Sequence, residues 1–207
     1  MKRIIKKEPD FFRTYIHERN PKDWTSISRD IGFEIRTYIL QGDELDSEQN
    51  NQCAYTEIAI KPDSNSSHID HYRKRSLYSS MIFNWDNLFV ACNSELYGAK
   101  YKDNRVRRGN ESIYDLLLNP SIDNPRDYFY YSITGMISPK SNDEDSVEYK
   151  KAKTTIDIFN LNEKSLREKR EGVAKGLYSY RGHFSVNEVK GIVNEFDTFV
   201  EEVYASL

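Results

Sequence analysis

Apolar residues recur at helical spacing near both ends of this chain, and this pattern limits the folds that it can adopt. Near the amino terminus four isoleucines fall four residues apart, on one face of a helix: Ile27, Ile31, Ile35 and Ile39. The spacing predicts a helix over residues 27–40, preceded by another over residues 9–19 that ends at Asn20-Pro21. One-sided apolar residues also predict a single last helix over residues 186–205.

The chain between these helices carries turn formers and short apolar runs, which favour extended segments and loops. In its first half we expect a loop over 41–52, a strand or knuckle over 53–60, a turn over 61–67, an extended segment over 68–72, and a strand or the start of a helix over 84–92. In its second half we expect a helix or strand over 113–118, a hairpin over 127–137, an amphipathic segment over 152–161, and a helix over 163–177 capped by Asn162. The fold class predicted is α+β.

Charge and composition exclude several classes of protein. Aromatic residues make up 13% of the 207 residues, enough to build a core, so global disorder is excluded. The net charge of -3 gives no general nucleic-acid footprint. No apolar run approaches the roughly 20 residues of a membrane span or follows the basic amino terminus, so a cytoplasmic protein is expected. Positive charge is concentrated in two clusters: Arg73, Lys74 and Arg75, and Lys100, Lys102, Arg105, Arg107 and Arg108.

The chain has two cysteines, Cys53 and Cys92. A reducing cytosol disfavours a disulfide between them. Two thiolates supply half of a four-ligand zinc site, and the other half would have to come from histidine or carboxylate groups. The alternative interpretation is that both are small buried hydrophobic residues.

The window from residue 53 to residue 104 carries the chemistry. It holds Asp70-His71, then Asn87, and then Cys92, which is the layout of an HNH, or ββα-metal, nuclease. Phosphodiester hydrolysis needs a water molecule deprotonated near neutral pH, which suits an imidazole, and a divalent cation that stabilises the developing charge. An asparagine can fix the loop or orient the histidine. His68 is open to two interpretations, a second metal ligand or a surface residue.

Over nearly its whole length, the sequence resembles the PtuB-type HNH nucleases of Septu anti-phage systems and of some retron defence modules. The resemblance is strongest at His68-Ile69-Asp70-His71-Tyr72-Arg73 and at Trp85-Asp86-Asn87-Leu88. It implies that His71 is the general base, Asp70 a metal ligand or its helper, and Asn87 the positioning residue. It also implies a small ββα-metal (HNH) core between amino- and carboxy-terminal helices, Mg²⁺ or Mn²⁺ at the active site, and a PtuA-type ATPase partner.

The sequence departs from this family at the zinc knuckle and at the last metal ligand. The family usually has a second cysteine where this chain has Thr56, and another before a glycine where this chain has Tyr97-Gly98. Hydroxyl groups are poor substitutes for thiolates, so we expect the structural zinc to be absent and Cys53 and Cys92 to form a degenerate knuckle. Glycine supplies no ligand, so the remaining metal ligands are expected among His68, Asn93, Asp103 and Asn104.

We therefore expect a metal-dependent endonuclease acting in phage defence on DNA or RNA, with tRNA left open. One structural unit is predicted, with a helical segment over residues 1–50, the core over 51–108, and a hairpin with helices over 109–207. The residues expected to contact phosphates are Arg73, Lys74, Arg75, Lys100 and Lys102. Two alternatives are a catalytically inactive subunit that binds nucleic acid or regulates the complex, and a structural partner that docks on the ATPase.

Overall fold

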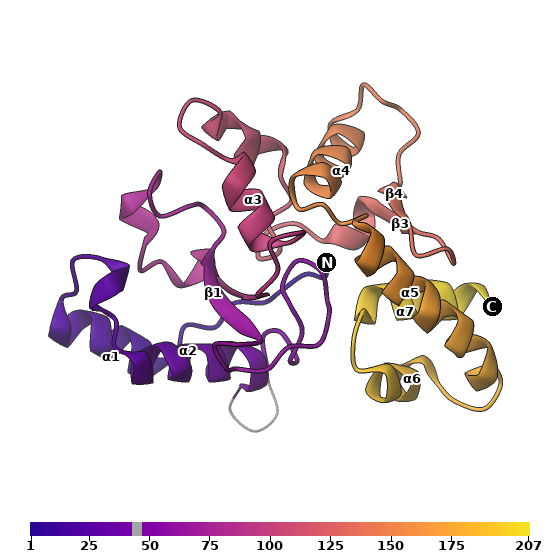
Figure 1. The fold of residues 1–207 in the computed structure, drawn as a ribbon, viewed down its shortest axis with the longest axis horizontal. Helices are drawn as coiled ribbons and strands as arrows, with labels where there is room; N and C mark the ends of the chain where they lie inside the picture. Colours follow the sequence, from indigo (N-terminus) through magenta and orange to yellow (C-terminus); the bar gives the residue numbers. More distant parts are fainter. Residues whose placement is uncertain (43–46) are drawn as a thin grey trace.

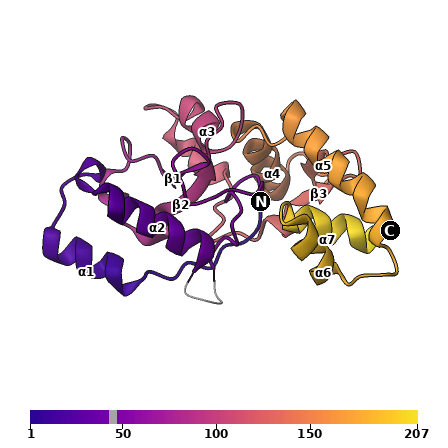
Figure 2. The same ribbon diagram turned by 60° about the horizontal axis from the view of Figure 1, so that its bottom comes forward.

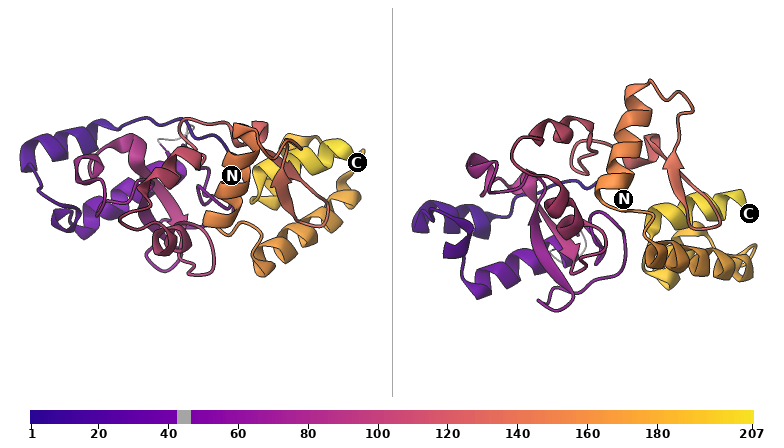
Figure 3. Two further views of the ribbon diagram at one scale, coloured as in Figure 1. Left: turned by 90° about the horizontal axis from the view of Figure 1, so that it is seen from above. Right: turned by 45° about the horizontal axis from the view of Figure 1, so that its top comes forward.

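The computed structural model describes residues 1–42 and 47–207 and has a mixed α+β architecture. Two small antiparallel sheets, β1-β2 and β3-β4, lie among the helices. The molecule is elongated, with helices α1 and α2 at one end, α5 to α7 at the other, and the amino terminus near the middle (Figures 1 and 3). Over the described residues, no helix combines the length and the apolar character that crossing a membrane requires.

The two helices predicted near the amino terminus are confirmed. Helix α1 spans Asp10–Arg19 and ends at Asn20, which adopts the left-handed conformation. Helix α2 spans Arg29–Gln41 and begins after Ser28, whose side chain accepts a hydrogen bond from the Ile31 amide. Helix α2 runs along β1 and β2 (Figure 2). Two isoleucines of its stripe, Ile35 and Ile39, are buried in the core.

The centre of the molecule is an antiparallel strand pair followed by a helix. Strand β1, Ser67–His71, confirms the predicted extended segment, and it pairs with strand β2, Leu88–Cys92. The segment 84–92, for which strand and helix were both open, forms a 3-10 turn at Trp85–Asn87 and then β2. Helix α3, Ala99–Arg105, follows β2. Asp70 pairs with Phe89 and His71 with Leu88, so this register fixes the Asp-His pair at the end of β1.

The segment 53–60 forms a tight turn and not a regular strand. The Cys53 amide donates to the Ile58 carbonyl, and a single bridge pairs Gln52 with Ala59. In the preceding segment, predicted as a loop, Gln41 still belongs to α2 and residues 43–46 lie outside the described residues.

The second half contains the predicted hairpin, formed by β3, Phe129–Tyr131, and β4, Ile137–Pro139. Helix α4 spans Val147–Ile158 and helix α5 spans Lys164–Leu177. Short 3-10 helices complete this half at Glu111–Leu116, Pro125–Asp127 and Tyr178–Tyr180, and the first of them overlaps the segment 113–118, which was left open between helix and strand.

Two predictions for this half are wrong. The last helix is in fact two, α6 at Val186–Val193 and α7 at Asp197–Ser206. Asn194 and Phe196 both have positive φ between them, and the Phe196 amide donates to the Glu57 carbonyl. Helix α5 is capped by Glu163, because the Asn162 side chain instead bonds the backbone of Ile137 in β4.

Contacts from the 53–60 turn join α7 to the centre of the molecule. A Glu57 carboxylate oxygen accepts a hydrogen bond from the Thr198 amide at 2.7 Å. The Gln52 side-chain amide donates to Asp197 at 2.7 Å. These polar contacts are buried, so they fix the direction in which α7 leaves the break after α6.

Gly135 provides a test of the hairpin's position on α5. Its φ is +76°, and a Cβ atom added there would collide with the Arg167 carbonyl oxygen of α5. Gly135→Ala should therefore lower the free energy of unfolding by about 1–3 kcal/mol in a denaturant titration.

Two control substitutions separate the causes. Gly32→Ala on α2 meets no atom within 4 Å and should stabilise by up to about 1 kcal/mol. Gly109→Ala has positive φ but also meets no atom within 4 Å, so it reports backbone strain alone. A Gly135→Ala loss no greater than that of Gly109→Ala would contradict the close contact with α5.

Candidate active site

His71 lies at the end of β1 beside a cavity of about 450 Å³. The lining is rich in positive side chains and includes one aromatic ring: Trp24, His68, His71, Lys74, Arg75 and Lys100, together with Asp70 and Asp103. The edge of the His71 ring packs against Trp24, with the ring centroids 4.6 Å apart and the planes at 89°. The imidazole is thus held on one side by an aromatic wall and opens toward a basic cavity.

A single hydrogen bond defines the tautomer of His71. Its Nε2 atom lies 2.9 Å from the Ile82 carbonyl oxygen. Since a carbonyl oxygen only accepts, Nε2 must carry the proton and donate it. In the neutral ring the lone pair is then on Nδ1, and none of the described residues hydrogen-bonds to that atom. Nδ1 is therefore the nitrogen that can take a proton.

Asn87 braces the chain immediately after His71. Its Oδ1 atom accepts from the Arg73 amide at 2.7 Å, and its Nδ2 atom donates to the Arg73 carbonyl at 3.1 Å. A third bond runs from Nδ2 to the Met81 carbonyl at 3.2 Å. The side chain does not bond the His71 ring. The sequence left open whether Asn87 fixes the loop or orients the histidine, and this geometry matches the first role.

Asp70 points into the protein and is 4% exposed. It accepts hydrogen bonds from the Tyr55 hydroxyl and from the Lys102 ammonium, which lies 2.9 Å from Oδ2 and 3.2 Å from Oδ1. Burial raises the pKa of the Asp70 carboxyl, but the Lys102 charge and the Tyr55 bond outweigh burial and hold it below its usual value. Asp70 is an ionised residue whose two oxygen atoms already have partners.

The positive residues predicted to contact phosphates separate into different environments. Lys102 is fully buried, so the expectation that it reaches a phosphate does not hold in this structure. The Lys74 ammonium bonds the backbone carbonyls of Asp103 and Val106. Arg75 is exposed at the cavity, and Lys100 lines it with an ion pair to Glu95 at 2.9 Å.

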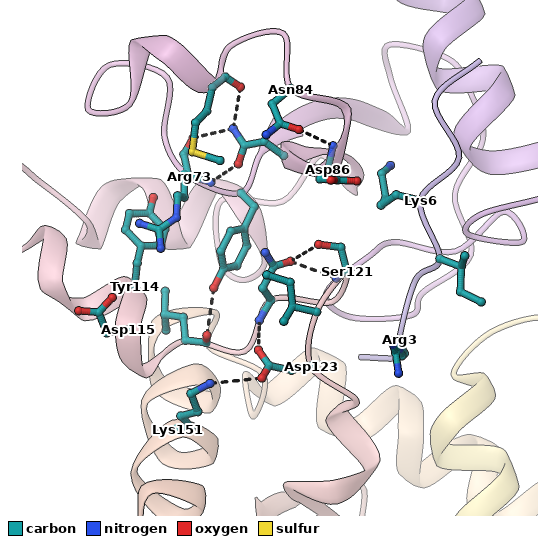
Figure 4. A pocket seen from close by; sticks show the side chains of 17 residues that line it. Arg3, Lys6, Arg73, Asn84, Asp86, Tyr114, Asp115, Ser121, Asp123 and Lys151 are labelled. Atoms are coloured by element: carbon teal, nitrogen blue, oxygen red, sulfur yellow. Dashed lines mark hydrogen bonds and ion pairs between the residues drawn. The ribbon is translucent and has the colours of Figure 1, made fainter. Parts of the chain in front are cut away.

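Arg73 faces a second, larger cavity of about 620 Å³, which Asn87 also lines. Figure 4 shows Arg73 beside Tyr114, with Asp123 paired to Lys151 across the cavity. Residues 71–75 thus contribute to both cavities: His71, Lys74 and Arg75 to one, and Arg73 to the other. The larger cavity has charges of both signs and does not contain the imidazole.

His68 and Asn93 are in contact, and His68, Asp70 and Asp103 line one cavity, but the residues proposed as metal ligands do not converge on one point. His68 Nδ1 lies 3.0 Å from Asn93 Oδ1, and the Asn93 amide bonds the backbone of the 61–67 turn. Asp103 lies beside the Lys102 ammonium, and Asn104 is exposed. Over residues 1–42 and 47–207, no three His, Cys, Asp or Glu side chains form a group able to hold a metal ion. The donor set therefore does not fit a preformed Mg²⁺ or Mn²⁺ site.

The predicted proximity of the two cysteines is confirmed. The Cys92 amide donates to Cys53 Sγ at 3.4 Å, and both thiols are free and buried. Thr56, which stands where the resemblance led us to expect a cysteine, has its Oγ1 atom 3.9 Å from Cys92 Sγ. A Cβ atom built at Gly98 would lie 3.6 Å from the same sulfur. Tyr55 stacks on Phe159 with 4.5 Å between centroids, so this turn is packed on α4.

Three contacts at this site were not predicted from the sequence. They are the Trp24 wall, the Ile82 carbonyl that fixes the His71 tautomer, and the pairing of Lys102 with Asp70. Lys102 stands in a run of basic residues, so nothing local separated it from its exposed neighbours. Trp24 lies between two predicted helices and had no pattern to place it.

The His71 environment gives a prediction for its titration. Burial lowers the pKa of the imidazole below its usual value near 6.5, more than the bond to Ile82 and the Asp70 charge raise it. The midpoint in an NMR titration should therefore fall below about 6.5. Because the folded state favours the neutral ring, the free energy of unfolding should fall as the pH drops through this range. A midpoint above 6.5, assigned by loss of the signal in His71→Ala, would contradict the burial argument.

The sequence was compared with family models and with curated proteins. No family model matches the chain. Its curated relatives include a Septu protein PtuB from Bacillus thuringiensis, 25% identical over 117 residues, which cover 55% of this chain and 38% of the relative. Another Septu protein PtuB, from Bacillus mycoides (strain KBAB4), is 25% identical over 177 residues, covering 74% of this chain and 58% of the relative. The chain spans less than two thirds of either relative's length. It is a distant homologue of the Septu PtuB proteins.

Proposed function

We propose that this chain is an HNH-type endonuclease of a Septu anti-phage system, with His71 as its general base. The observation that carries the proposal is the His71 ring, which lines a basic cavity and has its proton fixed on Nε2, so that the lone pair of the neutral ring is on Nδ1. The order β1, β2, α3 supports it, since a strand pair followed by a helix is the expected ββα arrangement.

In the proposed reaction, Nδ1 of neutral His71 takes a proton from a water molecule as the water oxygen attacks the phosphorus. The bond from phosphorus to the leaving ribose or deoxyribose oxygen then breaks, and that oxygen takes up a proton. Arg75 and Lys100 at the cavity offset the negative charge that develops on the phosphoryl oxygens. Asn87 keeps the loop after His71 in place, and Trp24 restricts the ring.

A divalent cation, Mg²⁺ or Mn²⁺, was expected at this site. Because the carboxylate of Asp70 is already paired and the described residues contain no group of His, Cys, Asp or Glu able to hold a metal ion, no step of the proposal passes through a metal. The degenerate knuckle has only two cysteine side chains, Cys53 and Cys92, and we propose that packing of the 53–60 turn stabilises this region without zinc.

The substrate class and the partner follow from the same proposal. The cavity presents charges and one aromatic wall, which suit a phosphodiester backbone and not a particular base, so both DNA and RNA are within its chemistry. We propose a PtuA-type ATPase as partner, because the relatives are Septu PtuB proteins.

A second function has a specific observation in its favour. Because Lys102 pairs with Asp70, the site has no free carboxylate at this position. This observation favours a function in which the chain binds nucleic acid or regulates the complex without cleaving. The two functions differ in what His71 does, because binding alone needs no proton acceptor.

The substitution His71→Ala tests the proposal. In the complex copurified with its ATPase, cleavage of single- and double-stranded DNA and of RNA should fall by about 10² to 10⁴. The wild-type rate should rise with pH through the imidazole pKa, since only neutral His71 accepts the proton.

His17→Ala is the matched control, because His17 is exposed on α1. It should cleave at the wild-type rate. If His71→Ala also cleaves at that rate, the assignment is wrong. If the wild-type complex binds these substrates and leaves them intact, the binding function takes its place.

A further inference from the structure

The Lys102 ammonium lies in a cage of oxygen atoms behind His71. From α3 it reaches both carboxylate oxygens of Asp70, at 2.9 and 3.2 Å, and the carbonyls of His71 and Tyr72, each at 3.0 Å. Its side chain is fully buried. Oxygen atoms from a carboxylate and from backbone carbonyls are the donors that hard divalent cations also prefer. In this chain they surround an amine.

The amine remains charged in this position. The nitrogen lies 2.9 Å from the Asp70 carboxylate, 3.3 Å from the Asp103 carboxylate and 3.0 Å from two backbone carbonyls, and these acceptors all match an ammonium that donates. A protonated amine has three hydrogen atoms to donate, and here more than three oxygen atoms compete for them. Lys102 thus acts as a permanently bound monovalent cation of this cage.

Both carboxylate oxygen atoms of Asp70 already accept hydrogen bonds from the protein. One oxygen atom accepts from both Lys102 and the Tyr55 hydroxyl, and the other accepts from Lys102. Tyr55 is itself held by stacking on Phe159. A divalent cation at Asp70 would lie next to the buried ammonium, and the low dielectric of the interior strongly opposes two adjacent positive charges.

We propose that the Lys102 ammonium takes the place of a divalent cation at Asp70, so that Asp70 binds no metal and serves as a structural residue. The His71 cavity then receives the phosphodiester with cations of the chain itself, Arg75 and Lys100. The inference rests on the proposed function only for the identity of that phosphodiester.

Mn²⁺ binding to the full-length chain tests the inference without any nucleic acid. In electron paramagnetic resonance titrations, the wild-type protein should show no stoichiometric Mn²⁺ site. Lys102→Met removes the ammonium and keeps an unbranched side chain, and it should bind Mn²⁺ about 10-fold to 100-fold more tightly than wild type. Adding Asp70→Asn to Lys102→Met should abolish the gain, because the carboxylate is the ligand.

Lys100→Met is the matched control. The substitution removes one positive charge from the same helix. Lys100 lines the same cavity as His71 but does not contact Asp70. It should leave Mn²⁺ binding at the wild-type level. An equal gain in Lys100→Met would show that net charge explains the effect and would overturn the proposal.

The wild-type titration is decisive by itself if Lys102→Met fails to fold. One Mn²⁺ bound per wild-type chain, and lost in a folded Asp70→Asn variant, would overturn the proposal. Absence of that site supports it. Failure here is distinguishable from failure of the proposed function, which is measured by the loss of cleavage in His71→Ala and not by metal binding.

Discussion

The buried ion pair between Lys102 and Asp70 is the interaction on which the centre of this protein depends. It joins α3 to β1, and through the Tyr55 hydroxyl it joins both to the 53–60 turn. The same ammonium holds the carbonyls of His71 and Tyr72, so it fixes the backbone that carries the imidazole. Removing one member of a buried pair leaves an uncompensated charge, which typically costs about 3–5 kcal/mol. The intact pair adds little net stability, because the cost of burying both charges offsets their attraction. Its main effect is to fix the backbone position of His71.

This arrangement separates two tasks within the site. Asp70 and Lys102 maintain the backbone from inside, whereas the His71 ring lines the cavity and is held by the Ile82 carbonyl and the Trp24 ring. Asn87 supports the following residues from the opposite cavity. Adjacent residues on a strand point to opposite faces, which is why neighbours as close as Asp70 and His71 can serve a buried network and an open cavity.

Local patterns predicted the local structure well. The α1, α2 and hairpin segments follow from periodicity and turn formers. The proximity of Cys53 and Cys92 was implied by the family resemblance and not by a local pattern. Long-range contacts overruled the pattern elsewhere. The apolar stripe of residues 186–205 continues through a break that exists because Phe196 bonds Glu57. Lys102 was grouped with exposed basic residues, since only the fold shows that Asp70 lies opposite it.

A double-mutant cycle on Asp70 and Lys102 measures the central interaction most directly. The free energies of unfolding of Asp70→Asn, Lys102→Met and the double variant would be compared with wild type in denaturant titrations at neutral pH. Because each single change leaves a buried polar or charged group without its partner, the double variant should be less destabilised than the sum of the singles, with a coupling of at least about 2 kcal/mol. Additivity within about 0.5 kcal/mol would contradict the account, because it would mean that the ammonium and the carboxylate do not depend on each other.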